Sequence, residues 1–246
     1  MKYITLIFFL ISPALLFSQT NPSPGEILKK IDDNTISDSK VVISEMVIHG
    51  RRGERTVKAK SWQRNIDDTF TEYLAPAREK GTKMLKLGDQ LWTYSPSTDR
   101  TIMISGHMLR QSVMGSDLSY EDMMEDPYLG NLYDGVITES DEIGGRDVWV
   151  MELNAKADNT AYAKRKIWVD KERYLILKEN LYAKSGKLLK QIDIHSVEQI
   201  EGRWVATSAT YKDVLKEGKG TEMILDSISF DEEVPDYIFS KASLRK

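Results

Sequence analysis

Apolar and polar residues alternate with a period of two over most of this chain, which is typical of β-strands. Strand-like runs recur from Val41 to Phe230, and turn sequences such as Gly88-Asp89 and Ser185-Gly186-Lys187 separate them. The pattern predicts an antiparallel meander of about a dozen short strands. So many strands cannot lie flat with one face dry, so we expect the sheet to curl, to close, or to be covered by helices.

Three short stretches depart from the strand pattern. Ser23-Pro24-Gly25-Glu26 combines a serine cap, a proline at the first helical position and a glutamate three residues after the cap, which predicts a helix over Ser23–Ile36. Ser119-Tyr120-Glu121-Asp122 resembles a capping box and predicts a helix near Ser119–Glu125. A third short helix is expected around Tyr237–Phe239. The fold class is therefore mainly β with a few helices, a curved antiparallel sheet forming a half-open barrel closed by a helical lid.

The stretch from Met103 to Pro127 is the least strand-like part of the chain after its start. It contains half of the ten methionines, which are Met103, Met108, Met114, Met123 and Met124. Methionine is unbranched and polarizable, so it suits surfaces that must adapt to variable apolar shapes. The stretch is expected to act as a lid over one open face of the sheet, or else to fill core between helix and sheet. Residue types alone do not separate these two readings.

Polar residues within this stretch are expected to fix its shape. Gly115, Ser116 and Asp117 predict a tight turn, and Ser119 with Asp122 predicts the helix cap. Arg110 is expected to form an ion pair with Asp117 or Asp122 and so to anchor the stretch.

All five tryptophans fall in predicted strands. Aromatic rings on a concave sheet face make good walls for an acyl-chain pocket, and they make equally good core. We expect the lipid-binding side chains to combine tryptophans with the apolar residues of the lid and of one strand. This set is Trp62, Met84, Trp92, Met103, Met108, Leu109, Met114, Trp149 and Trp168.

The chain begins with Lys2, an apolar run from Tyr3 to Phe17 and a polar exit, which predicts a signal peptide over residues 1–18. An uncleaved anchor is the competing interpretation, but the run is short for a span of about 20 residues. Residues 19–246 are expected to form one domain, soluble in the periplasm. The chain contains no cysteine, so no lipid can be attached through one, and its net charge of −4 argues against nucleic acid as a partner.

Signatures of catalysis and of metal binding are weak. The three histidines are far apart, and neither zinc-site spacing nor a calcium-loop sequence is present. Ser112 and Ser116 stand near His107 and Asp117, which invites a catalytic-triad interpretation, but no G-x-S-x-G elbow surrounds either serine. No catalytic residue, metal ligand or cofactor is therefore assigned.

The stretch from Gly106 to Asp122, GHMLRQSVMGSDLSYED, resembles the outer-membrane lipoprotein-sorting protein family of LolA-like proteins. Leu91–Pro96 before it and Ile167–Asp170 after it agree, and the resemblance covers essentially the whole mature chain. It implies an incomplete β-barrel with helices as a lid over an apolar cavity. It also implies non-catalytic binding of acyl chains of lipoproteins or other lipids on the way to the outer membrane, with an inner-membrane exporter as partner.

Two other classes of function stay open at this point. One is a periplasmic interaction or stress-sensing module that uses the same fold to bind a protein. The other is a hydrolase that acts on lipid.

Overall fold

The computed structural model describes residues 22–50 and 53–245, so the predicted signal peptide lies outside the described residues. Its strands are β1 (Ser39–Gly50), β2 (Gly53–Arg64), β3 (Asp68–Ala75), β4 (Lys83–Leu87), β5 (Gln90–Ser95), β6 (Arg100–Ile104), β7 (Tyr133–Ile143), β8 (Arg146–Ala155), β9 (Lys164–Asp170), β10 (Ile176–Tyr182), β11 (Leu188–Ile200), β12 (Arg203–Asp213) and β13 (Thr221–Phe230). The α-helices are α1 (Pro24–Thr35), α2 (Tyr120–Met124) and α3 (Leu129–Leu132). The 3₁₀ turns are η1 (Gly106–Arg110), η2 (Val113–Gly115), η3 (Asp236–Ile238) and η4 (Lys241–Arg245).

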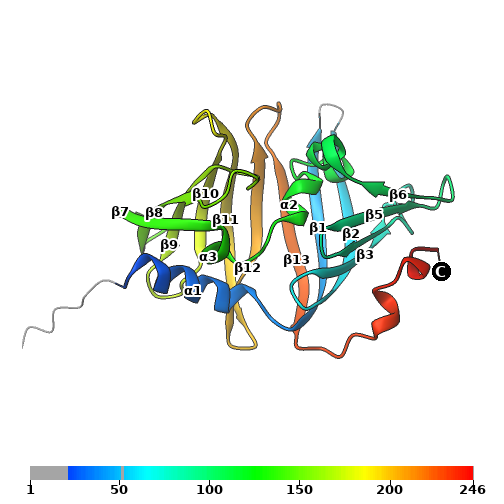
Figure 1. Cartoon of the computed structure of the whole chain (residues 1–246), viewed down its shortest axis with the longest axis horizontal. Helices are drawn as coiled ribbons and strands as arrows, with labels where there is room; N and C mark the ends of the chain where they lie inside the picture. The colour runs from blue at the N-terminus through cyan, green and yellow to red at the C-terminus, as the bar shows by residue number, and fades with distance from the viewer. Residues whose placement is uncertain (1–21, 51–52, 246) are drawn as a thin grey trace, which may run out of the picture.

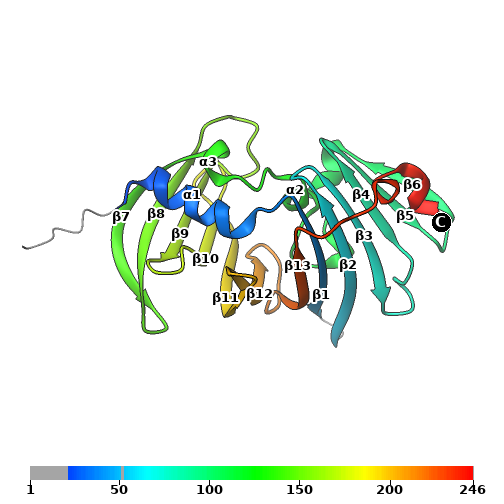
Figure 2. The same ribbon diagram turned by 90° about the horizontal axis from the view of Figure 1, so that it is seen from below.

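These strands form one 13-stranded antiparallel sheet in the order β6-β5-β4-β3-β2-β1-β13-β12-β11-β10-β9-β8-β7. Nearly every neighbour in the sheet is a neighbour in sequence, so most connections are tight turns. The exception is the β1–β13 pair, which joins the two ends of the meander. The strands at the two edges, β6 and β7, do not pair with each other, so the curved sheet stays open (Figures 1 and 2). The predicted fold class is confirmed.

The two helices expected inside the chain are present. Ser23 caps α1, its N–H donates to the Glu26 carboxylate at 2.7 Å, and Glu26 N–H donates to the Ser23 hydroxyl at 3.3 Å. The second predicted helix corresponds to α2, and the expected turn near the end of the chain is η3. Among the described residues, no helix combines the length and the apolar character needed to cross a membrane.

One face of the sheet, the inner face, carries the longest helix. Ile27, Leu28 and Ile31 of α1 are buried against side chains of β8 and β9. The helix therefore covers part of the inner face in the half of the sheet that contains β8 and β9. Figure 1 shows α1 in blue.

Residues 105–132, which connect the two edge strands and which we call the crossing segment, run over the inner face from one half to the other. Their first part, up to α2, packs on β1 to β5, and α3 packs beside α1. The crossing segment contains η1, η2, α2 and α3, shown in green in Figures 1 and 2. Because β6 and β7 lie at opposite edges, this connection must pass over the inner face rather than around a turn.

The opposite, outer face of β2 to β6 has its own core. Strand register places five apolar side chains in one cross-strand row, which runs Trp62, Phe70, Leu85, Trp92 and Met103. Phe239 and Leu244, near the end of the chain, pack on this row. Neighbouring residues in a strand point to opposite faces, so Met84 lies on the inner face although Leu85 lies on the outer one.

Candidate functional site

Polar side chains of the inner face are arranged in line under the crossing segment. Arg165 of β9 pairs with Leu181 of β10, Leu181 with Lys190 of β11, and Lys190 with Asp213 of β12. These residues therefore form one row across four strands. Acidic residues of the crossing segment contact three members of the row, so the segment follows the row across the sheet.

The middle contact joins Asp122 of α2 to Lys190. The carboxylate pairs with the Lys190 ammonium group, and it accepts hydrogen bonds from the Ser119 N–H at 2.7 Å and from the Tyr162 hydroxyl. Burial opposes ionisation of Asp122, but Lys190 and these hydrogen bonds outweigh it and lower the pKa of the carboxyl. Tyr162 belongs to the loop of residues 156–163, so this contact ties three separate parts of the chain together.

A second contact lies one helical turn further along the crossing segment. Glu125 forms an ion pair with Arg165, whose other branch binds Glu179 of β10 at 2.8 Å. Arg165 is buried, which opposes its charge, but Glu179 and Glu125 outweigh burial and raise the pKa of the guanidinium above its ordinary value. Tyr133 completes the cluster, because its hydroxyl donates to Glu125 at 3.2 Å and burial raises its pKa to about 12.

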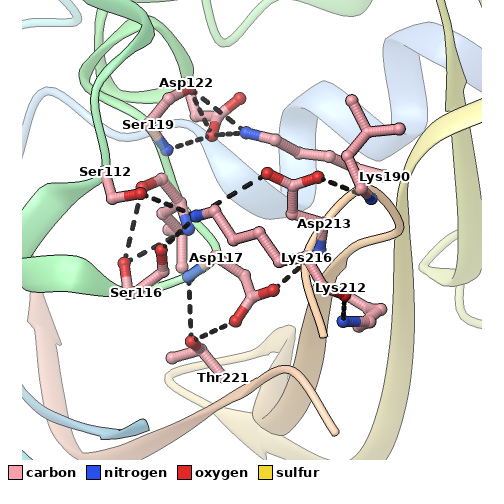
Figure 3. Close-up of polar contacts among 12 residues, drawn as sticks. Ser112, Ser116, Asp117, Ser119, Asp122, Lys190, Lys212, Asp213, Lys216 and Thr221 are labelled. Atoms are coloured by element: carbon pink, nitrogen blue, oxygen red, sulfur yellow. Dashed lines mark hydrogen bonds and ion pairs between the residues drawn. The ribbon is translucent and has the colours of Figure 1, made fainter. Parts of the chain in front are cut away.

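The third contact holds Asp117 in the predicted tight turn (Figure 3). Its N–H donates to the Thr221 hydroxyl at 2.9 Å, and that hydroxyl donates to the Asp117 carboxylate at 2.8 Å. The other carboxylate oxygen accepts the Asp213 N–H at 2.9 Å. Lys216 adds hydrogen bonds to the Ser112 hydroxyl at 2.6 Å and to the Ser116 carbonyl at 2.7 Å. Asp117 and Thr221 are both buried.

Arg55 of β2 supports the turn from the other side. Its guanidinium donates to the carbonyl of Met114 and pairs with Glu79 at 2.9 Å. Met114 has φ of 50° and Gly115 φ of 74°, both in the left-handed region. A side chain at Gly115 would meet the Arg55 guanidinium at 3.4 Å, so glycine fits both the conformation and the close approach.

Between these contacts, methionines fill the space under the crossing segment. The sheet contributes Met46, Met84 and Met223, and the crossing segment contributes Met108, Met114, Met123 and Met124. We call these seven side chains the methionine cluster. The sheet members of the cluster are buried or half-buried, and the four from the segment are half-buried. Tyr73 and Leu109 pack against the methionine cluster, and burial raises the pKa of the Tyr73 hydroxyl.

An apolar pocket opens next to this covered region, between α1 and the central strands. It has a volume of about 170 Å³ and is lined mainly by Ile31, Leu175, Ile176, Ile192, Ile194 and Tyr211. Burial raises the pKa of Tyr211 to about 12, so its hydroxyl stays protonated at neutral pH. A pocket of this size has room for a small apolar group.

The predicted lipid-binding residues divide between the two faces. Met84, Met108, Leu109 and Met114 lie together on the inner face. Trp149 is also on the inner face, but it is packed beneath α1 and against Tyr174.

The remaining four predicted residues require a correction. Trp62, Trp92 and Met103 belong to the outer row, and Trp168 packs on the outer face with Val148 and Val150. None of them shares a space with the crossing segment, because strand alternation turns them to the opposite side of the sheet.

The predicted polar anchors are partly as expected. Ser119 and Asp122 form the expected cap, and Ser116 and Asp117 are buried in the turn. The expected ion pair of Arg110 does not form: Arg110 is exposed, and within the described part of the chain its side chain has neither an ion pair nor a hydrogen bond. Lys190, rather than Arg110, forms the ion pair with Asp122.

The serine, histidine and aspartate that invited a catalytic-triad interpretation do not come together. Ser112 accepts a hydrogen bond from Lys216, the Ser116 hydroxyl donates to the Leu118 carbonyl at 3.4 Å, and Asp117 is occupied by Thr221. His107 is exposed and contacts none of these groups.

Sequence reasoning missed the basic residues of the sheet that hold the crossing segment. Lys190 has the same strand parity as Ile192 and Ile194, and Arg165 has that of Ile167 and Val169. A cation at an inward-facing position of a strand is rare unless it is paired with an anion. This pattern in the sequence therefore indicated that Lys190 and Arg165 have acidic partners.

Comparison with known proteins supports the fold and a family. A model of a family described as "uncharacterized protein" matches residues 65–246. No curated protein matches the sequence. A DUF1329 family protein from Desulfovibrio piger is 24% identical, with a TM-score of 0.82 over 89% of this chain and 97% of that one.

Two further solved structures are similar. A domain from Vibrio parahaemolyticus that is named for outer membrane lipoprotein sorting is 24% identical, with a TM-score of 0.77 over 90% of this chain and 98% of that one. A LolA superfamily protein from Nitrosomonas europaea is 23% identical, with a TM-score of 0.75 over 90% and 99%. The chain belongs to the family whose model it matches, and its open curved sheet is the LolA-like fold of the lipoprotein-sorting proteins.

Proposed function

We propose that this protein is a periplasmic carrier that binds acyl chains on the inner face of its sheet, with the crossing segment as a movable cover. The observation that carries the proposal is the methionine cluster. It brings together seven of the ten methionines of the chain, four from the crossing segment and three from the sheet beneath it. Flexible, polarizable side chains on both sides of one interface can repack around a chain of variable length.

The energetics favour a reversible exchange. Burying about ten CH₂ groups of an acyl chain contributes about 8 kcal/mol. Exposing four fully buried methionines to water would cost roughly 6–12 kcal/mol, at about 1.5–3 kcal/mol each. The four methionines of the crossing segment are half-buried, so exposing them costs less than this. The two amounts are comparable, so an acyl chain can replace the contacts of the cover.

The polar contacts give the cover a defined closed position. Asp117, Asp122 and Glu125 each contact the sheet, and the methionines lie beside this line of contacts. These polar contacts can re-form in only one position of the crossing segment on the sheet, whereas apolar contacts alone would allow several positions. The small apolar pocket beside α1 offers room into which the end of a chain can extend. The names of two structural relatives, which refer to lipoprotein sorting and to LolA, support the same class of ligand.

Native mass spectrometry of the exported protein tests this proposal. We expect the purified protein to carry co-purifying lipid that is released on denaturation, and to take up a fluorescent fatty acid afterwards. A protein that carries no lipid and binds no acyl probe would contradict the carrier function. The same spectrum gives the N-terminus, which we expect near Gln19.

A further inference from the structure

A polar pocket of about 520 Å³ lies beside the crossing segment. Arg110 and Glu121 of that segment line it, as do Asn159 and Thr160 of the loop of residues 156–163. The rest of its wall comes from further residues of the crossing segment and of this loop, from the ends of β11 and β12, and from the turn after β12, and it includes Lys190.

Most charged side chains of this pocket are already neutralised. Lys190 pairs with Asp122, Lys216 lies 3.6 Å from Asp213, and Asp158 pairs with Lys184 at 2.8 Å. Asp117 instead accepts hydrogen bonds from the Thr221 hydroxyl and from a backbone N–H.

Arg110 and Glu121 are different from these. Within the residues that the structure describes, neither side chain has an ion pair or a hydrogen bond, and the two side chains do not pair with each other. One pocket therefore presents one cation and one anion that are both available to a ligand.

A second pocket of about 390 Å³ adjoins the first and connects it to apolar side chains. The two pockets share Glu121, Asn159 and Thr160 in their walls, and the second is also lined by Leu109 and Met124. Met124 belongs to the methionine cluster, and Leu109 packs against it. A ligand could therefore place a charged end at Arg110 and Glu121 while an apolar chain runs toward the methionines.

We propose that the polar pocket binds the headgroup of a zwitterionic phospholipid, with its phosphate at Arg110 and its ammonium group at Glu121. A guanidinium binds phosphate through paired charge-assisted hydrogen bonds, and a carboxylate accepts those of an ammonium group. An anionic headgroup without an amine leaves Glu121 without a counter-charge and close to a second negative group. This inference rests on the proposed carrier function and names the class of lipid carried.

Two measurements on the mature protein test the inference. The first is calorimetric titration with glycerophosphoethanolamine, a soluble headgroup without acyl chains. The second is lipid uptake from vesicles of phosphatidylethanolamine or of phosphatidylglycerol with identical acyl chains. We expect Arg110→Gln and Glu121→Gln each to weaken headgroup binding about tenfold, since each removes a charge-assisted contact. The wild type should take up phosphatidylethanolamine in preference to phosphatidylglycerol.

Matched controls separate the pocket from general charge effects. Arg100→Gln and Glu198→Gln change exposed residues outside the pocket and should leave headgroup affinity unchanged. Binding of a fluorescent fatty acid, which has no headgroup, should be equal in the wild type and in Arg110→Gln.

Either of two results would overturn the inference: a headgroup affinity that neither substitution changes, or equal uptake of the two phospholipids. The carrier proposal fails separately, if the wild type binds no fatty acid and no phospholipid. The titration with the soluble headgroup still decides whether the pocket recognises it.

Discussion

Asp122 of the crossing segment and Lys190 of β11 form an ion pair on the inner face of the sheet, although 67 residues separate them in sequence. Both side chains are largely buried, with 19% and 11% of their surfaces exposed. Removing one member therefore leaves the other charge in a poorly solvated position. This pair is the central one of the three contacts that hold the segment on the sheet.

Asp122→Asn should lower the free energy of unfolding by about 3 kcal/mol, since it leaves Lys190 buried without a counter-charge. Lys190→Met should lower the free energy of unfolding less in the Asp122→Asn variant than in the wild type. In that variant Lys190 has already lost its counter-charge, so removing the lysine also removes an unpaired buried charge. Urea unfolding of the two single variants and the double variant measures this coupling. Additive effects of the two substitutions would show that the pair is not coupled.

Stability should fall at acidic pH in part through the same carboxyl. The pKa of Asp122 is lower in the folded protein than its ordinary value, so the group favours folding at pH values above its unfolded pKa of about 3.9. This contribution is lost as the pH falls through the folded pKa. The difference in unfolding free energy between wild type and Asp122→Asn should therefore shrink between about pH 5 and about pH 3. A difference that stays constant across this range would contradict the assignment.

The methionines should affect ligand binding more than stability. Met108→Ser with Met123→Ser removes two half-buried side chains from the methionine cluster. We expect uptake of a fluorescent fatty acid to weaken at least tenfold, because each buried methionine is worth about 1.5–3 kcal/mol. Met103→Ser, on the outer face, is the matched control and should bind the probe normally.

Thermal melting of the same proteins distinguishes a cover from a core. A double variant that melts far below the wild type and still binds the probe normally would mean that the methionines only fill core.

Much of the fold follows from local patterns in the sequence. The period-two alternation and the glycine turns predict the meander, and the serine caps predict α1 and α2. Which face each strand residue occupies follows less easily. Trp92 and Met84 were both assigned to the lipid site, but the register of β4 with β5 places Leu85, not Met84, opposite Trp92.

The anchors of the crossing segment depend on contacts between distant parts of the chain. Asp122 has Arg110 close by in sequence, which made that residue the natural candidate for its partner. The sheet instead brings Lys190 to it, and Arg165 to Glu125, from strands that follow the segment by tens of residues. The alternation of Lys190 with Ile192 shows the face of the lysine, but no local pattern shows which carboxylate lies above it.

A reversible cross-link between the crossing segment and the sheet tests the cover directly. The Asp117 carboxylate and the Thr221 hydroxyl are 2.8 Å apart, and the chain has no cysteine of its own. Asp117→Cys with Thr221→Cys therefore offers one disulfide between the cover and β13. The two single variants serve as controls for the loss of the hydrogen bonds.

Uptake of a fluorescent fatty acid by this double variant, oxidised and then reduced, is the most direct test of a movable cover. We predict that the oxidised protein takes up the probe at least tenfold more slowly than the reduced protein, and that reductant restores uptake to the level of the single variants. Equal uptake by the oxidised and the reduced protein, with the disulfide verified by mass, would show that acyl chains bind without movement of the crossing segment.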